Sequence, residues 1–133
     1  MQEFYVIFAS RDRNNLLRKM LKPGFGTVAV VCVKHDGYNV GVNVTSAGID
    51  IKLVNINYKN YAGKGYHILK LRRVADAKKS DAVRLWTTPI RCCAVVKQVL
   101  KIHECTIISP YQLFKALSKN PGKYGYEVLE TIV

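Results

Sequence analysis

The sequence predicts an α+β fold in which an antiparallel sheet packs against helices. Short segments rich in valine and isoleucine fill much of the first half of the chain, which favours strands. An Asp36-Gly37 pair separates two of these segments, as in a tight hairpin. Two stretches in the second half place apolar residues at helical spacing. Because no linker, repeat or low-complexity tract divides the chain, we expect one domain over residues 1–133.

The N-terminal part predicts a strand followed by a helix. Residues 3–8 (EFYVIF) form the first expected strand, and a helix is expected over residues 12–21. One side of this helix is apolar and carries Leu16, Leu17, Met20 and Leu21. Pro23 and Gly24 then end the helix.

The clearest strand signal is a hairpin made by residues 27–33 (TVAVVCV) and 38–44 (YNVGVNV). If Asp36 and Gly37 form a two-residue loop, the pairs are Val33–Val40, Val31–Val42, Ala29–Val44 and Thr27–Ser46. In this register the valines share one face of the hairpin, and Thr27 lies at the far end of that face.

Two more strands are expected at residues 49–56 and 66–72, with the loop NYKNYAGKG between them. Residues 74–81 show no clear pattern and stay unassigned. Residues 83–87 (VRLWT) are a candidate for a last strand before the C-terminal helices.

The first C-terminal helix begins near Pro89, which suits a first helical turn because it lacks an amide proton. Its expected buried side carries Cys92, Val95, Val96, Val99 and Leu100. Its expected solvent side carries Arg91, Lys97, Gln98 and Lys101.

A capping box of Ser109 and Gln112 around Pro110 starts the second C-terminal helix, which runs to about Ser118. Asn120, Pro121 and Gly122 end it. The last stretch, KYGYEVLETIV, fits either a docked strand or a loose tail.

The chain is strongly basic, with a net charge of +12 and a pI near 9.7. The charges are spread along the sequence and form no basic tail. Two interpretations remain open: a solvated basic surface, or a face that binds nucleic acid by displacing counterions. The longest clean apolar run, residues 28–33, is too short to span a membrane, and the N-terminus lacks the pattern of a signal peptide.

Two of the four cysteines, Cys92 and Cys93, stand together at a helix start, where unpaired amides and the helix dipole favour a thiolate. The other two are Cys32 and Cys105, and the spacing indicates free thiols rather than a disulfide framework. Either member of the pair also suits a core, because cysteine is often buried as a small apolar residue.

Three strings, LLRKMLKPGFGTVAVV, TPIRCCAVVKQVLKI and ISPYQLFKAL, resemble in order and spacing a small family of phage and prophage papain-like proteins. The resemblance spans about residues 16–118 and implies a circularly permuted papain-like fold, with a histidine strand before a cysteine helix. It places Cys92 at the position of the nucleophile and Thr27 at the position of the catalytic histidine. Cys93 falls where the family has an apolar residue.

A threonine hydroxyl cannot act as a general base near neutral pH, and losing such a base typically lowers a rate by about 10²- to 10⁴-fold. The resemblance therefore implies a catalytically degenerate domain that serves as a structural or interaction module of a phage virion, in its tail, head-tail or ejection apparatus. It implies other virion proteins as partners, DNA as a further partner of the basic surface, and a location in the virion or host cytoplasm. The oligomeric state stays open.

A second hypothesis is an active cysteine hydrolase, a peptidase or amidase, in which Cys92 is the nucleophile and a displaced histidine is the base. His67, at the start of an expected strand, is the best candidate. His35 lies at the hairpin turn, and His103 lies about three turns beyond Cys92. Asn43 could orient a base, but the predicted register places it on the face opposite Thr27.

A tyrosine- and lysine-rich loop is the candidate surface for nucleic acid or a protein partner, and it contains Tyr58, Lys59, Tyr61, Lys64 and Tyr66. Aromatic rings stack on bases and lysines contact phosphates, which would suit nucleic acid. Tyrosine is also enriched in protein interfaces, and of the two interpretations we prefer a protein partner. Cys32 with His35 and His103 with Cys105 have ligand-like spacing, yet the second pair is too close for a usual zinc knuckle. We expect no metal and no cofactor.

Overall fold

The computed structural model describes residues 2–9, 25–34, 38–45, 48–55, 57–74, 91–104 and 106–133. The helix expected over 12–21, the Asp36-Gly37 turn, nearly all of the unassigned segment 74–81 and the candidate strand at 83–87 lie outside these residues. None of the helices in the described part of the chain has the length and apolarity that a membrane crossing requires.

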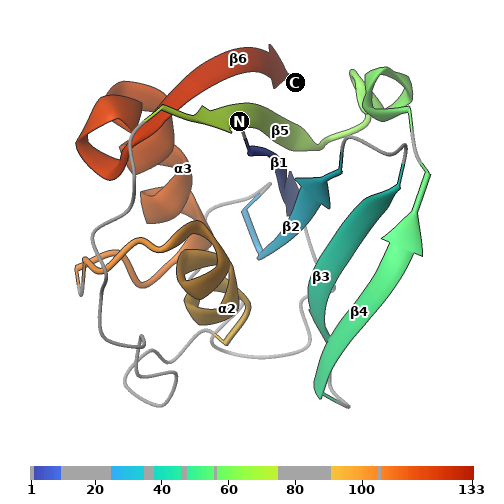
Figure 1. Cartoon of the computed structure of the whole chain (residues 1–133), viewed down its shortest axis with the longest axis horizontal. Helices are drawn as coiled ribbons and strands as arrows, with labels where there is room; N and C mark the ends of the chain where they lie inside the picture. The colour runs from blue at the N-terminus through green and yellow to red at the C-terminus, as the bar shows by residue number, and fades with distance from the viewer. Residues whose placement is uncertain are drawn as a thin grey trace.

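The described strands form one antiparallel sheet in the order β4-β3-β2-β1-β5-β6 (Figure 1). Their bounds are β1 Glu3–Ala9, β2 Thr27–Val33, β3 Asn39–Thr45, β4 Gly48–Val54, β5 His67–Arg73 and β6 Tyr126–Ile132. The sheet and the two helices beside it confirm the α+β prediction. β6 also resolves the open question about the C-terminal stretch, which is a docked strand.

Helices α2 (Arg91–Leu100) and α3 (Pro110–Lys119) lie on the same side of the sheet, as Figure 1 shows. Alternate residues of the central strands point toward them, and together they form the main core. From the sheet this core takes Phe4, Val6, Phe8, Val28, Val30, Leu69, Leu71 and Tyr126. From the helices it takes Cys92, Cys93, Val96, Leu100, Leu113 and Leu117.

A second, smaller core lies on the opposite face of the sheet, which we call the open face. A short 3-10 helix, η1 (Tyr58–Tyr61), lies against that face. Its Tyr58 ring stacks on Tyr5 of β1, with the ring centroids 4.0 Å apart. The buried members of this core are Val31, Tyr58, Ile68 and Ile132.

The register predicted for the β2–β3 hairpin is wrong by one residue. Val31 pairs with Gly41 rather than Val42, and the last pair joins Val33 to Asn39. The Lys34 amide then donates to the Tyr38 carbonyl at 3.1 Å, so the connection is longer than the two residues assumed. Because strand side chains alternate, a slip of one residue exchanges the faces.

In the observed register the two strands share a different set of inward residues. Val28, Val30 and Cys32 of β2 share the helix-covered face with Val40 and Val42 of β3. Val31 lies on the open face instead.

Helix α2 ends in a Schellman motif. Lys101 adopts a φ of 56°, and the Ile102 amide donates to the Lys97 carbonyl at 2.8 Å. The Lys101 amide donates to the Gln98 carbonyl at 3.2 Å, which completes the motif. This turn sends the following segment back along the helix.

The prediction that Lys97 faces water is wrong, because its side chain is only 2% exposed. Its ammonium donates to the carbonyl oxygens of Glu104 and Ile107, each at 2.7 Å. The returning segment supplies these acceptors, which helical periodicity within α2 could not reveal. Gln98 and Lys101 are exposed as expected.

The capping box of α3 is confirmed. The Gln112 amide donates to the Ser109 hydroxyl at 3.2 Å, and the Gln112 side chain accepts from the Ser109 amide at 3.1 Å. A 3-10 turn, η3 (Pro121–Tyr124), follows the helix and leads into β6. Leu113 and Leu117 turn the inner side of α3 toward the sheet.

Candidate functional site

The adjacent cysteines lie inside the main core rather than on the surface. Cys92 is 6% exposed and Cys93 is fully buried. Burial, with the neighbouring Cys92 thiol as a smaller cause, raises the pKa of Cys93 to about 12. Cys93 is therefore a neutral thiol at physiological pH, packed as a small apolar residue.

Thr27, at the position that the resemblance assigns to the catalytic histidine, points to the face of the sheet away from Cys92. Its neighbour Val28 is fully buried in the core that holds Cys92. Thr27 itself pairs with Ala9 of β1, on the face where Ile7 packs with the second core. The sheet therefore separates the Thr27 side chain from the Cys92 thiol.

Asn43 lies on the same face as Thr27, which corrects the expectation drawn from the predicted register. The one-residue slip of β3 is the reason. Asn43 is exposed, and its side-chain oxygen accepts a hydrogen bond from the Val44 amide at 2.9 Å. Within the part of the chain that the structure describes, Asn43 makes no hydrogen bond to a histidine.

His67 is on the correct face of the sheet for Cys92 but lies in an aromatic cluster. It pairs with Phe8 at the start of β5. Its ring centroid lies 4.6 Å from that of Phe25 and 5.6 Å from that of Phe114. Its Nδ1 atom is buried without a hydrogen-bond partner. Across the described residues, no hydrogen bond joins the Cys92 thiol to a histidine.

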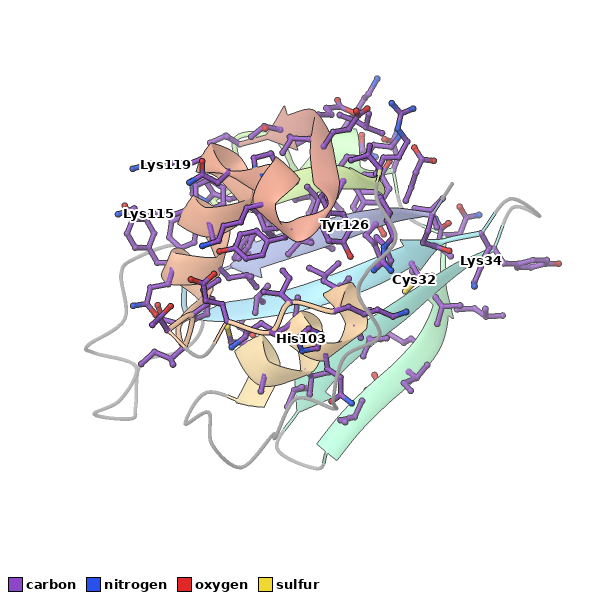
Figure 2. All side chains as sticks on the ribbon, turned by 60° about the vertical axis from the view of Figure 1, so that its left-hand side comes forward. Cys32, Lys34, His103, Lys115, Lys119 and Tyr126 are labelled. Atoms are coloured by element: carbon purple, nitrogen blue, oxygen red, sulfur yellow. The ribbon has the colours of Figure 1, made fainter. Side chains whose placement is uncertain are left out.

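His103 is exposed and follows the last turn of α2 (Figure 2). Cys92 lies in the first turn, so the length of the helix, about 15 Å for ten residues, separates the two. His35 is outside the described residues. The structure thus brings neither His67 nor His103 to Cys92 as a base.

The tyrosine-rich loop is largely structural. Tyr58 is 5% exposed and stacked on Tyr5, so its ring is not available to stack on a base. Tyr61 and Tyr66 are half-buried and meet edge to face, with centroids 5.0 Å apart. Of the five residues proposed here, only Lys59 and Lys64 are exposed.

Several basic side chains of the described residues are engaged within the protein. Ion pairs join Lys52 to Asp50, Lys70 to Glu3, Arg72 to Glu127 and Lys123 to Glu104. Lys115 and Lys119 are exposed and extend from α3 away from the sheet (Figure 2), and the Lys115 Nζ atom lies 5.6 Å from the centroid of the Tyr111 ring. The described surface therefore combines these ion pairs with several further exposed lysines, at positions 34, 59, 64, 101, 115 and 119.

A buried polar cluster that the sequence analysis missed ties the end of α2 to the sheet. The Tyr126 hydroxyl donates to the Leu100 carbonyl at 2.6 Å, and Arg73 donates to the Tyr126 oxygen at 2.6 Å. Arg73 also donates to the Leu100 carbonyl at 3.4 Å. Leu100 is the last residue of the helix, so no amide of the helix donates to its carbonyl oxygen and the hydrogen-bond donor must come from outside the helix.

An exposed apolar row on β4 was also not predicted from the sequence. Ile49, Ile51 and Leu53 are 53%, 65% and 67% exposed. They lie on the helix-covered face, opposite Val44, Val42 and Val40 of β3. Their alternation with Asp50 and Lys52 was visible in the sequence, but the position of β4 at the sheet edge was not.

No group of three or more histidine, cysteine or acidic side chains with metal-binding geometry occurs among the described residues, a set that leaves out His35 and Cys105. No family model, curated protein or solved structure matches the chain.

Proposed function

We propose that this protein is a non-catalytic interaction module rather than a cysteine hydrolase. One observation carries the proposal: Cys92 is buried in the main core with no histidine bonded to its thiol among the described residues. A thiol hydrolase needs its nucleophile within hydrogen-bond reach of a base and open to a substrate.

The placement of Thr27 adds support. A side chain at this position projects from the open face of the sheet, whereas Cys92 packs on the other face. A histidine at position 27 would need a different side-chain direction to reach the thiol. The loss of the histidine is therefore only one of two obstacles to catalysis at Cys92.

The setting that we propose is a phage virion, with other virion proteins as partners. This part of the proposal, and the permuted papain-like ancestry, rest on the resemblance of the three sequence strings. The antiparallel sheet with helices on one face is compatible with that ancestry. A degenerate hydrolase domain would keep its fold and its cysteine helix, while its surfaces would bind other proteins of the virion.

Thiol labelling tests the proposal directly. We expect iodoacetamide to modify Cys92 of the native protein more slowly than it modifies free cysteine at pH 7.5, because the thiol is buried and no described histidine is hydrogen-bonded to it. The measurement is the labelling rate at each cysteine by mass spectrometry, with the urea-unfolded protein as reference. His67→Gln is the matched control, and it should leave the Cys92 rate unchanged.

Labelling of Cys92 faster than free cysteine, together with a loss of that rate in His67→Gln, would support the hydrolase hypothesis instead. Thr27→His offers a further check. We expect this variant to label at the wild-type rate, because the new imidazole would lie across the sheet from Cys92.

Nucleic-acid binding is the second candidate, favoured by the net charge of +12 and by the exposed Lys115 and Lys119 of α3. Binding of this kind releases counterions, so the affinity for duplex DNA should fall steeply with salt. Fluorescence anisotropy at 50 and 200 mM salt measures this slope. A Lys115→Gln, Lys119→Gln variant should reduce the slope if α3 faces the phosphates.

A further inference from the structure

We propose that β4 is a dimerisation edge that pairs antiparallel with β4 of a second copy, around a two-fold axis through Ile51. This inference deepens the proposed function by naming one partner of the module, a second copy of the chain. Its geometry does not depend on Cys92, so the two proposals can fail separately.

β4 has one strand neighbour among the described residues and therefore presents one side of its backbone outward. Such an edge is a template for another strand. Its seven residues extend without a register shift against β3. β4 can thus accept a partner strand over Ile49–Leu53, the residues that the proposed pairing uses.

The side chains of β4 are unusual for an edge left in water. The exposed row of Ile49, Ile51 and Leu53 forms a continuous apolar strip on one face. Helix α2 packs on β2 and β3, which lie further into the sheet. Water-exposed edges usually carry charges on such positions, and a contiguous apolar strip points to an interaction surface.

The sequence of β4 is complementary to itself in the antiparallel direction. A two-fold axis at Ile51 places that residue opposite its own copy and Ile49 opposite the partner's Leu53. On the other face the same axis places Asp50 opposite the partner's Lys52, and Lys52 opposite the partner's Asp50. Opposite charges directly across an antiparallel pair stabilise it, and like charges destabilise it.

Charge complementarity therefore selects a second copy as the occupant. An isologous interface requires every contact to occur twice, and this edge meets that requirement with two apolar pairs and two ion pairs around one central contact. It also lowers the cost of bringing together two chains of net charge +12, because Asp50 and Lys52 leave the edge itself neutral.

The other edge strand, β6, lacks these properties. Its pairing with β5 contains a register shift between Lys70 and Leu71, which bends the strand. Its C-terminal carbonyl, on Val133, accepts from the Gly63 amide at 3.0 Å. Glu127 and Glu130 give this strand two like charges, so an antiparallel copy would find no matching lysines on it.

A charge-exchange experiment tests the register. Asp50→Lys should place like charges across both Asp50–Lys52 pairs and raise the dimer dissociation constant at least about tenfold. Lys52→Asp should have the same effect. An equimolar mixture of the two variants should form a heterodimer, because each new charge then faces its opposite. Sedimentation velocity over a concentration series gives the constants, and native mass spectrometry identifies the heterodimer.

Controls separate this effect from folding and from total charge. Lys119→Asp makes the same charge change as Lys52→Asp on exposed α3 and should leave the dimer intact. The double variant D50K/K52D should dimerise like the wild type. Circular dichroism of each variant verifies that the fold is kept.

A cross-link provides a second measurement of the axis. Ile51→Cys should form an interchain disulfide under mild oxidation, because the two copies meet at this residue. Leu53→Cys should form much less, since it faces the partner's Ile49. The wild-type chain, treated in the same way, accounts for its own cysteines.

A wild-type protein that stays monomeric at every soluble concentration would overturn the proposal. So would a dimer that persists in both charge variants, a mixture that fails to form the heterodimer, or preferential cross-linking at position 53. None of these outcomes changes the labelling rate of Cys92, so the non-catalytic proposal would stand or fall on its own test.

Discussion

The two edge strands of the sheet differ in how far the rest of the chain contacts and covers them. At one edge, β6 is tied to its surroundings by Tyr126, by the Arg73 contact and by the Gly63 amide. At the other edge, β4 leaves Ile49, Ile51 and Leu53 in water. Both are seven-residue antiparallel strands, so strand propensity does not explain the difference.

Position relative to the helices explains it better. Helix α3 and the turn η3 contact β6, and α2 contacts β2 and β3 near the middle of the sheet. The apolar side chains of β6 and its neighbours therefore find a core, whereas those of β4 extend beyond it. An apolar alternation can thus be covered within the chain or left for a second chain, and the position of the edge strand relative to the helices distinguishes the two cases.

The largest expected effect is at the buried Lys97. Lys97→Ala removes the donor of two hydrogen bonds and leaves the Glu104 and Ile107 carbonyls unpaired, at a cost of about 3 kcal/mol in the free energy of unfolding. Lys64→Ala, in the exposed turn before β5, is the matched control and should change that free energy by less than about 0.5 kcal/mol. Urea unfolding at one fixed protein concentration measures both, and similar costs at the two lysines would break the comparison.

Next in size is a pair of tyrosine substitutions with different expected signs. Tyr126→Phe removes a buried hydrogen bond to Leu100 and should destabilise the protein by about 1 to 2 kcal/mol. Tyr58→Phe removes a buried hydroxyl that has no partner and should be neutral or stabilising. Thermal unfolding by circular dichroism measures the pair. Equal destabilisation by both would contradict the assignment of Tyr126 as the anchor of β6.

Alkaline pH should lower the free energy of unfolding through the ionisation of Cys93, which lies in the main core. Its pKa is raised from 9.0 to about 12 in the folded state, mainly by burial. The raised folded pKa gives a stability contribution that is complete below pH 9 and lost as the pH rises toward 12, by at most about 1.4 kcal/mol per unit. Cys93→Ala should remove this part of the decline, which urea unfolding between pH 8 and 10 with a reductant can measure. An unchanged pH slope in the variant would contradict a buried neutral thiol.

The smallest expected effect is at Glu104, beside the turn that leads into β6. The Tyr124 hydroxyl donates to its carboxylate at 2.5 Å, and this bond, helped by Lys123, lowers the pKa of Glu104 below its usual 4.5. A lowered folded pKa gives stability that is present above pH 4.5 and lost as the pH falls through the folded value. Glu104→Gln should therefore flatten the acid side of the melting-temperature profile. A profile as steep as that of the wild type would contradict the assignment.

Local sequence signals predicted many of the described elements. Alternating valines located β2 and β3, and Ser109 with Gln112 located the start of α3, because each signal depends on residues close in the chain. The predicted hairpin register was wrong because it assumed a two-residue loop, and one additional loop residue shifts every pair. The predicted exposure of Lys97 was wrong because the carbonyls that accept its hydrogen bonds belong to the segment after the helix, which helical periodicity does not describe.

The candidate site was harder to predict than the fold. The resemblance paired Cys92 with position 27, but no local pattern shows which face of a strand meets a distant helix. The β2 side chains that meet the helix-covered core include Val28 and Val30, and this leaves Thr27 on the other face. The apolar row of β4 was readable as alternation, yet its exposure depends on the order of strands in the sheet.

Hydrogen exchange at two protein concentrations tests the difference between the edges most directly. If β4 is the dimer edge, amides of peptides covering residues 48–54 should exchange more slowly at high concentration, because the partner strand protects their outward groups. Peptides covering Tyr126–Ile132 should exchange at the same rate at both concentrations. Concentration-independent exchange in β4, or an equal change in both strands, would contradict the assignment of β4 as the edge reserved for a second copy.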